Sequence, residues 1–282
     1  MATPPDAFRG SEACNARGVL LLPLHIQPHP PNARPSSRST AFISRPLSGS
    51  LLFTPPSTAS TAACIHHTMS GSNIHVVEHP LISHHLANLR LADTSPKEFR
   101  SLVKNISSVL CIEATRSLPV KGVQGQGPLA TFQGEQLAPR LGLVPILRAG
   151  LGMTEACLEL LPENTSVLHI GLFREKVSLQ PVEYYNKLPV SPTVDQVIIL
   201  DPLIATGGTA VACIQMILDW GIPVDKIKFL CVLASQKGLE HVTESVPGLE
   251  IWVGHVDPEL SEKGLILPGL GDTGDRMFDT LT

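Results

Sequence analysis

One segment constrains the fold more than any other: an apolar run, an acidic residue, a loop of small residues and then a helical pattern. The apolar run is Val197–Leu200, Asp201 follows it, and the loop reads Ala205-Thr-Gly-Gly-Thr209. The β-branched run predicts a buried strand, and the pattern over 209–220 predicts a helix that stops at Gly221. A strand that leads through a short loop into a helix is typical of parallel α/β proteins.

The loop has the chemistry to hold a sugar phosphate. Glycines let backbone N–H groups turn toward an anion, and the start of the following helix adds its positive end. The hydroxyls of Thr206 and Thr209 can donate to phosphate oxygens, and Asp201 can accept from ribose hydroxyls. The pattern is neither a Walker loop nor GxGxxG, which disfavours a nucleotide kinase and a dehydrogenase. Gly207-Gly208 alone would indicate only a tight turn.

Strands and helices alternate along the rest of the chain, which predicts an open parallel sheet with helices on both faces. Ser95 is a predicted helix cap, followed by proline at the first helical position and apolar residues at helical spacing up to Leu110. Gly122–Gly127 is expected to be a turn-rich connection. The other expected helices cover 81–89 and 153–161, and the other expected strands cover 143–147, 167–172, 227–234 and 249–255.

At this loop the chain resembles the type I phosphoribosyltransferases, and within them the uracil-specific branch. The resemblance rests on a single acid followed by proline, where most of the superfamily has two acids. It implies binding of 5-phosphoribosyl-1-pyrophosphate (PRPP). This sequence departs from the usual text of the branch at Leu203, Ile204 and Thr209, all conservatively. The implied PRPP contacts are Asp201, Pro202, Leu203, Ile204, Ala205, Thr206, Gly207, Gly208 and Thr209.

Two arginines match the family's grip on the PRPP phosphates. Arg148 lies in Pro145-Ile-Leu-Arg-Ala-Gly150, which resembles the pyrophosphate loop, and a guanidinium offers permanently charged, forked donors. Arg174 lies in Gly171-Leu-Phe-Arg174, where the family also places such an arginine. The resemblance thus implies Arg148, Arg174 and Asp201 as catalytic residues. The stretch 175–189 resembles either the family's mobile arm over the site or an exposed hairpin with packing tyrosines.

The segment Gly264–Arg276 resembles the part of the family that binds uracil. The resemblance implies that Ile266, Gly271, Asp272 and Thr273 surround the base, and that Asp272 also reaches PRPP or the water shell of Mg²⁺. Leu265 stands where tyrosine is common, and Thr273 stands where alanine is common. Taken alone, this glycine- and aspartate-rich stretch would read as a cluster of turns.

Together the three segments imply a uracil phosphoribosyltransferase, a pentosyltransferase that makes UMP and pyrophosphate from uracil and PRPP. The implied fold is an open, mostly parallel sheet flanked by helices, with a small hood formed by the N- and C-terminal segments. Mg²⁺ is the implied cofactor, held mainly by substrate phosphates without dedicated protein ligands. GTP is a candidate effector, and a homodimer or homotetramer is expected. A phosphoribosyltransferase for another base and a non-catalytic regulator that binds nucleotide or RNA are the alternatives.

Composition narrows the possible binding partners and cellular locations of the protein. The net charge of -4 and the 4% aromatic content argue against a nucleic-acid surface, and no apolar stretch is long enough for a membrane span. The six cysteines include no CxxC pair, which favours a reducing compartment. Residues 1–72 are expected to be a disordered or targeting-like extension, and 73–282 the phosphoribosyltransferase domain. A cytoplasmic location is expected, or an organellar one if 1–68 act as a transit peptide; a start at Met69 is a third reading.

Overall fold

The central sheet contains nine strands and is mostly parallel. The structure is a computed structural model that describes residues 66–68, 73–174 and 181–280. The strand order is β1-β2-β13-β11-β9-β5-β7-β8, with β6 paired to β5. Only the two edge pairs, β1 with β2 and β7 with β8, are antiparallel. The bounds are β1 His66–Thr68, β2 Ile74–Val77, β5 Leu141–Leu147, β6 Ser166–Val167, β7 Ile170–Arg174, β8 Pro181–Asn186, β9 Gln196–Leu200, β11 Ile227–Cys231 and β13 Glu250–Val253.

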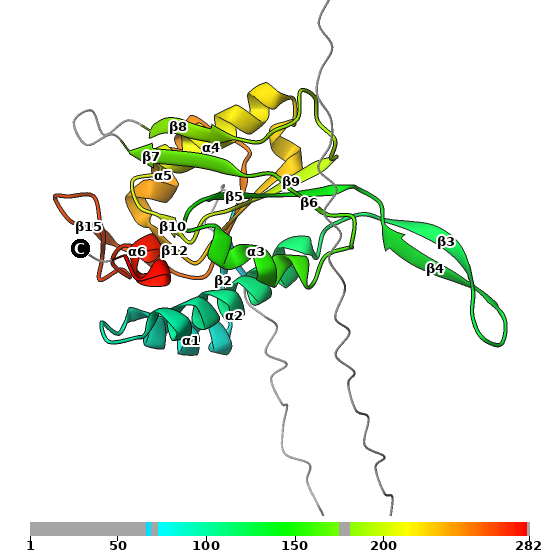
Figure 1. Cartoon of the computed structure of the whole chain (residues 1–282), viewed down its shortest axis with the longest axis horizontal. Helices are drawn as coiled ribbons and strands as arrows, with labels where there is room; N and C mark the ends of the chain where they lie inside the picture. The colour runs from blue at the N-terminus through cyan, green and yellow to red at the C-terminus, as the bar shows by residue number, and fades with distance from the viewer. Residues whose placement is uncertain (1–65, 69–72, 175–180, 281–282) are drawn as a thin grey trace, which may run out of the picture. The chain divides into compact units, whose positions relative to one another are not determined.

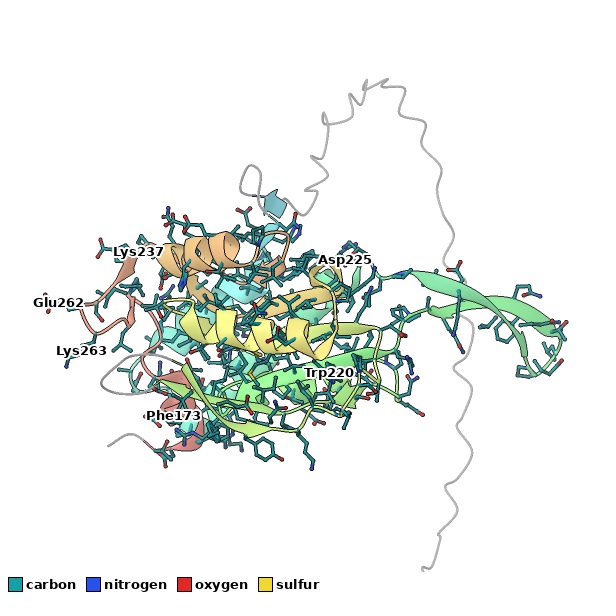
Figure 2. The ribbon with its side chains drawn as sticks, turned by 90° about the horizontal axis from the view of Figure 1, so that it is seen from above. Phe173, Trp220, Asp225, Lys237, Glu262 and Lys263 are labelled. Carbon is teal, nitrogen blue, oxygen red and sulfur yellow. The ribbon has the colours of Figure 1, made fainter. Side chains whose placement is uncertain are left out.

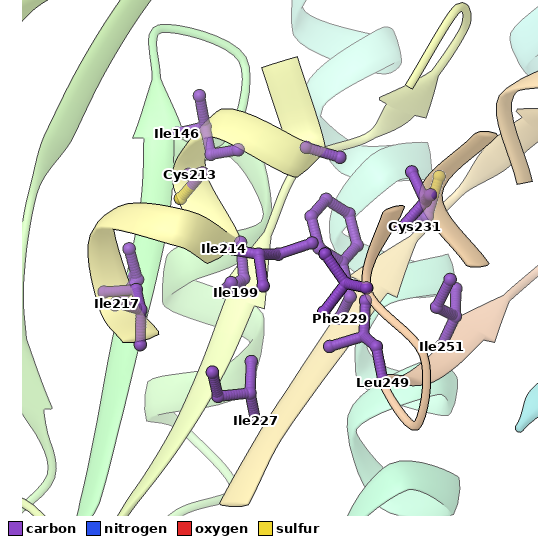
Figure 3. Packing of buried hydrophobic residues seen from close by; sticks show 14 of the residues in the cluster. Ile146, Ile199, Cys213, Ile214, Ile217, Ile227, Phe229, Cys231, Leu249 and Ile251 are labelled. Carbon is purple, nitrogen blue, oxygen red and sulfur yellow. The ribbon is translucent and has the colours of Figure 1, made fainter. Parts of the chain in front are cut away.

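Helices cover both faces of this sheet, as the alternation of strands and helices predicts. Helices α1 (Pro80–Arg90), α2 (Pro96–Thr115) and α3 (Leu151–Leu158) share one core with the sheet, and α4 (Gly208–Trp220) and α5 (Gln236–Ser245) share the other. Because side chains alternate along a strand, β9 serves both cores. Its residues Val197 and Ile199 belong to the core under α4 and α5, and Ile198 and Leu200 to the opposite core. Figure 3 shows Ile214 of α4 near Ile199 and Phe229.

Most of the predicted elements are confirmed. The strand at 197–200, the helix at 209–220 and the helix capped by Ser95 all form, and the Ser95 side chain accepts from the backbone N–H of Glu98. The predicted strand 167–172 is divided into β6 and β7. The predicted strand 227–234 is divided into β11 and β12 (Leu233–Ser235), where the N–H groups of Val232 and Leu233 turn to the carbonyl of Pro202.

The prediction of a turn-rich connection at Gly122–Gly127 was wrong. All of this stretch except Gly127 lies in β3 (Val120–Gln126). This strand pairs antiparallel with β4 (Thr131–Leu137) in a ribbon that extends away from the central sheet (Figure 1). Glycine and glutamine are poor strand formers, but the Phe132 ring lies over Gly125, where a β-carbon would come within 2.4 Å of it. The glycines thus leave room for an aromatic ring on the ribbon.

The C-terminal segment forms a hood together with α1, as expected. It contains β14 (Val256–Asp257), β15 (Glu259–Leu260), β16 (Ile266–Leu267) and α6 (Thr273–Phe278). Arg90 at the end of α1 binds the Asp257 carboxylate through both terminal nitrogens, at 2.7 and 2.8 Å. Arg276 of α6 donates to the backbone carbonyls of Leu89, Leu91 and Leu270. These contacts fix the hood beside the carboxyl ends of the sheet strands.

The predicted N-terminal extension falls almost wholly outside the described residues. Only β1 lies within it, paired with β2 in the register His66 to Val77. The boundary at residue 72 therefore stays a prediction. None of the helices in the described ranges has the length and apolar character needed to cross a membrane.

Candidate active site

A cavity of about 550 Å³ opens where the carboxyl ends of β5, β7 and β9 meet the hood. Ligands of open α/β sheets bind at this edge. One wall is the turn after β5, with Arg148 and Ala149, and the floor includes Asp201 and Thr209. The opposite wall is the start of α6 with the loop before it. Three segments that are far apart in the sequence therefore share one cavity.

The predicted phosphate loop forms a smaller hollow, of about 130 Å³, next to this cavity. Its lining includes Asp201, Ala205, Gly207 and Thr209. Gly207 precedes α4 with a φ of 83°, a left-handed conformation that favours glycine. The first described helical bond runs from the Val211 N–H to the Gly207 carbonyl, so the amides just before Val211 have no acceptor within the helix. Such a set of amides at a helix start suits a phosphate group.

Helix α5 and its cap residue Ser235 contact this loop and hold its carbonyl groups. The Ser235 hydroxyl donates to the carbonyl of Ala205 at 2.5 Å, and a ring nitrogen of His241 lies 2.8 Å from the carbonyl of Thr206. A β-carbon on Gly207 would lie 2.7 Å from the carbonyl oxygen of Gly238. The carbonyls of Ala205 and Thr206 are thus held on the side of α5, while Ala205 itself lines the hollow. Sequence reasoning did not identify α5, although Ser235 is a recognisable helix cap.

Asp201 occupies an apolar position at the end of β9. Burial raises its pKa to about 7, and a hydrogen bond from the Leu203 N–H, at 3.4 Å, offsets part of this shift. A carboxyl group with a pKa near neutral that lines a cavity is a frequent mark of a binding or catalytic site.

Arg148 lines the cavity from the turn after β5. Its side chain is half exposed, and its Nη2 lies 2.7 Å from Oδ1 of Asp275. Its Nη1 donates to the Thr280 hydroxyl at 3.2 Å. Gly150, two residues later, has no room for a side chain, since a β-carbon would lie 2.3 Å from the carbonyl oxygen of Leu200. The absence of a side chain at Gly150 thus lets the turn pack closely against the end of β9.

Arg174 is the last residue of β7, and its side chain lies outside the described part of the structure. Its strand neighbour Phe173 lines the cavity, as does Tyr184 of β8, and the two rings lie 6.1 Å apart. Phe173 is half exposed at the surface (Figure 2). Of the stretch 175–189, expected to be a mobile arm or an exposed hairpin, residues 181–186 form β8, which pairs antiparallel with β7, and 175–180 lie outside the described residues. Sequence reasoning left its aromatic residues out of the site.

The predicted base-binding residues divide into two groups. Gly271, Asp272 and Thr273 line the cavity. Ile266 does not appear in the described lining, because its side chain belongs to the core under α1 and α2. Its neighbour Leu265, which is half exposed, lines the cavity in its place. Leu265 immediately precedes β16, and the two adjacent side chains point in different directions, one to the core and one to the cavity.

The predicted PRPP contacts also divide. Within the described ranges, the linings of the two hollows include Asp201, Leu203, Ile204, Ala205, Gly207, Thr209 and Asp272, but not Pro202, Thr206 or Gly208. Pro202 is buried, and its carbonyl accepts hydrogen bonds from Val232 and Leu233. These bonds tie the loop to the start of β12.

The site fits a metal that is held mainly by a substrate. Within the described ranges, no group of three or more His, Cys, Asp or Glu side chains is placed to hold an ion. Two carboxylates, Asp201 and Asp272, nevertheless line the same cavity. Mg²⁺ is commonly bound by substrate phosphates and one or two carboxylates, with water in its other positions.

Comparisons with known proteins agree with this geometry. The family model for uracil phosphoribosyltransferase matches residues 76–280. A uracil phosphoribosyltransferase from Roseiflexus castenholzii is 46% identical over 207 residues, covering 73% of this chain and 98% of the relative. One from Natranaerobius thermophilus is 46% identical over 210 residues, covering 74% of this chain and 99% of the relative.

A solved structure shares the fold. A protein from Aquifex aeolicus superposes with a TM-score of 0.68 at 34% identity, covering 73% of this chain and 98% of that one. The family match includes the loop after β9, the turn with Arg148 and the hood, which are the three parts of the cavity. The chain belongs to the uracil phosphoribosyltransferase family.

Proposed function

We propose that this cavity transfers the phosphoribosyl group of PRPP to uracil, giving UMP and pyrophosphate. The observation that carries the proposal is the shared cavity: the phosphate loop, the Arg148 turn and the glycine-rich start of α6 all border it. A ribose 5-phosphate, a diphosphate and a planar base each need a different chemistry. The three bordering segments offer backbone amides, a guanidinium and a partly apolar wall.

In this proposal the 5-phosphate lies on the amides that open α4, and Asp201 accepts from the ribose hydroxyls. The diphosphate lies against Arg148, with Arg174 as the second arginine. The bond from C1′ to the diphosphate oxygen breaks, a bond from C1′ to uracil N1 forms, and the proton of N1 is released. Arginine beside the leaving group stabilises the negative charge that grows on it. Bound Mg²⁺ would add to that stabilisation, with Asp201 and Asp272 as the carboxylates that reach its water shell.

Gly271, Asp272 and Thr273 hold the base in this proposal, with Leu265 as an apolar contact. Uracil presents two carbonyl oxygens that flank one N–H group. A glycine-containing segment can offer backbone donors and acceptors to that edge, because few side chains block it. Phe173 and Tyr184 border the same cavity and help to exclude water from the reacting atoms.

The direct test is to incubate the full chain with PRPP, Mg²⁺ and labelled uracil and to measure UMP. A panel that includes cytosine, adenine, guanine and hypoxanthine tests the choice of base. UMP formation with uracil alone is the expected result. Pyrophosphate release with a purine, or no transfer to any base, would overturn the proposal.

Arg148→Ala should lower kcat/KM, because a charge-assisted contact to the leaving group is lost. The fall should correspond to a loss of about 2–4 kcal/mol of transition-state stabilisation. Arg140→Ala is the matched control, since Arg140 is also an exposed arginine in an ion pair, with Asp195 at 3.0 Å, and it lies away from the cavity. Steady-state kinetics of both variants separate a site effect from a general loss of charge.

The wider setting of the enzyme is also a proposal. We infer a homodimer or homotetramer that acts in the cytoplasm, or in an organelle if residues 1–68 direct it there, with GTP as a candidate effector. The family resemblance is the ground for the assembly and the effector, and the arginine- and serine-rich, acid-poor composition of residues 1–68 is the ground for the organellar alternative. Size-exclusion chromatography with light scattering tests the assembly, assays with and without GTP test activation, and microscopy of tagged chains that begin at Met1 or Met69 tests the location.

A further inference from the structure

The guanidinium of Arg148 is held by two residues that lie just beyond the predicted base-binding segment. Asp275 accepts from Nη2 at 2.7 Å, and Thr280 accepts from Nη1 at 3.2 Å. The Thr280 hydroxyl in turn donates to the same Asp275 oxygen at 2.6 Å. The three side chains therefore form a closed triangle of hydrogen bonds across 132 residues of sequence.

The backbone of α6 places this pair. The Asp272 side chain accepts from the Asp275 N–H at 2.9 Å and so caps the helix. Asp279 then takes a left-handed conformation with a φ of 56°, and the Thr280 N–H returns to the Asp275 carbonyl at 3.1 Å. This turn brings the Thr280 hydroxyl next to the Asp275 carboxylate. Hydrogen bonds from Thr280, and then from Arg148, lower the pKa of Asp275 and keep it ionised at neutral pH.

The two residues that hold Arg148 are outside the described lining of the cavity. Arg148 lines the cavity while it is bound to Asp275, and neither Asp275 nor Thr280 is among the described residues of that lining. A guanidinium has five N–H donors, and the two acceptors use one on each terminal nitrogen. The remaining donors are available to an anion without any need to break the triangle.

We propose that Asp275 and Thr280 are positioning residues that hold the Arg148 guanidinium ready for the diphosphate of PRPP. The proposal rests on the proposed function, in which Arg148 binds that diphosphate. An arginine held in place loses less rotational freedom when it binds an anion than one that is free to move. Because the same short helix begins at the base-binding segment, the pair also ties the base wall to the diphosphate wall.

The test measures pyrophosphate binding to the full chain by calorimetry, together with the KM values for PRPP and uracil. For Asp275→Ala we expect about tenfold weaker pyrophosphate binding and a similar rise in the KM for PRPP, because a misplaced group loses much of its effect. Thr280→Val should give a smaller change in the same direction. The KM for uracil should stay within about twofold, since Asp275 does not border the base.

Asp195→Asn is the matched control, because Asp195 also holds an arginine through two oxygens and lies outside the cavity lining. A double-mutant cycle gives the sharpest test: in an Arg148→Ala background, Asp275→Ala should have no further effect on pyrophosphate binding. An effect that persists there, tighter binding by Asp275→Ala, or an equal rise in both KM values would overturn the positioning role. If the wild-type chain binds pyrophosphate but forms no UMP, the proposed function fails and the binding comparison still stands.

Discussion

Gly238 of α5 lies against the carbonyl of Ala205 so closely that a β-carbon there would come within 2.3 Å of the oxygen. Ala205 belongs to the phosphate loop, and Gly238 belongs to the helix that supports it. The contact is between backbones, so no side chain can give way. The position of the loop therefore depends on a glycine that never faces the ligand.

We expect Gly238→Ala to lower the free energy of unfolding by about 1–3 kcal/mol, because the added methyl group must push the loop or the helix aside. The KM for PRPP should rise in the same variant, since the loop amides move with Ala205. Urea unfolding and steady-state kinetics measure the two effects.

Gly122→Ala is the control for this substitution. A β-carbon on Gly122 would meet nothing within 4 Å, and the residue lies in the exposed ribbon of β3. Its unfolding free energy and KM should stay close to wild type. If the two variants behave alike, the close contact with Ala205 does not determine the shape of the loop.

Asp201 should make stability depend on pH. Burial raises its pKa from 3.8 to about 7 in the folded chain, so between these values the folded state binds more protons than the unfolded state. The free energy of unfolding must then fall as pH rises through this range. The part of this fall that Asp201 causes is on the order of 2–4 kcal/mol. Asp201→Asn removes this contribution.

Urea unfolding of both proteins at several pH values between 4.5 and 8 checks this prediction, with other titrating groups cancelling in the difference. The stability of Asp201→Asn relative to wild type should increase toward high pH. A difference that stays constant would mean that the Asp201 carboxylate is well solvated.

The sequence was sufficient for the parts of the site that depend on local pattern. The strand before Asp201, the glycine conformation at 207 and the helix start are encoded within a few residues, and all three form. The expectation that the three cavity segments belong to one site came from the family resemblance. The arginine turn and the segment 271–273 do border one cavity with Asp201.

Other features depend on contacts that no local pattern contains. The link from Arg148 to Asp275 joins residues 127 positions apart, and α6 is too short to show a helical period. Helix α5 has Leu239 and Val242 as its buried apolar side chains, which is a weak pattern. In the ribbon of β3 and β4, the β-branched residues Val120, Val123 and Thr131 are outnumbered by glycine and glutamine, which makes the strand pattern weak. The ribbon is held by backbone pairing and by Phe132 over glycine.

The ion pair between Arg90 and Asp257 should contribute strongly to the stability of the hood. Burial alone would raise the pKa of Asp257, but hydrogen bonds from Arg90 and from the Gly269 N–H hold that pKa below its usual value. Arg90→Met would leave a nearly buried carboxylate without its cation. The expected loss of unfolding free energy is about 3–5 kcal/mol.

Arg140→Met provides the comparison, because both partners of the Arg140–Asp195 pair are largely exposed. Its cost should be below about 1 kcal/mol. Thermal or urea unfolding of the two variants measures the difference. Equal costs would show that the Asp257 carboxylate finds water or another donor once Arg90 is removed.

Thr273 carries a buried hydroxyl that has no hydrogen-bond partner among the described residues, and Thr165 carries another. Thr273 lines the cavity, whereas Thr165 does not appear in its lining. An unsatisfied buried hydroxyl costs stability, so valine, which has the same shape, should leave the unfolding free energy unchanged or raise it by up to about 1 kcal/mol at either position.

Uracil is proposed to lie against Thr273 and can supply the missing partner after a rotation of the side chain. Thr273→Val should therefore raise the KM for uracil severalfold, and Thr165→Val should leave it unchanged. Thr273→Ser, which keeps the hydroxyl, should stay near wild type. If valine and serine at 273 give the same KM, the hydroxyl has no part in holding the base.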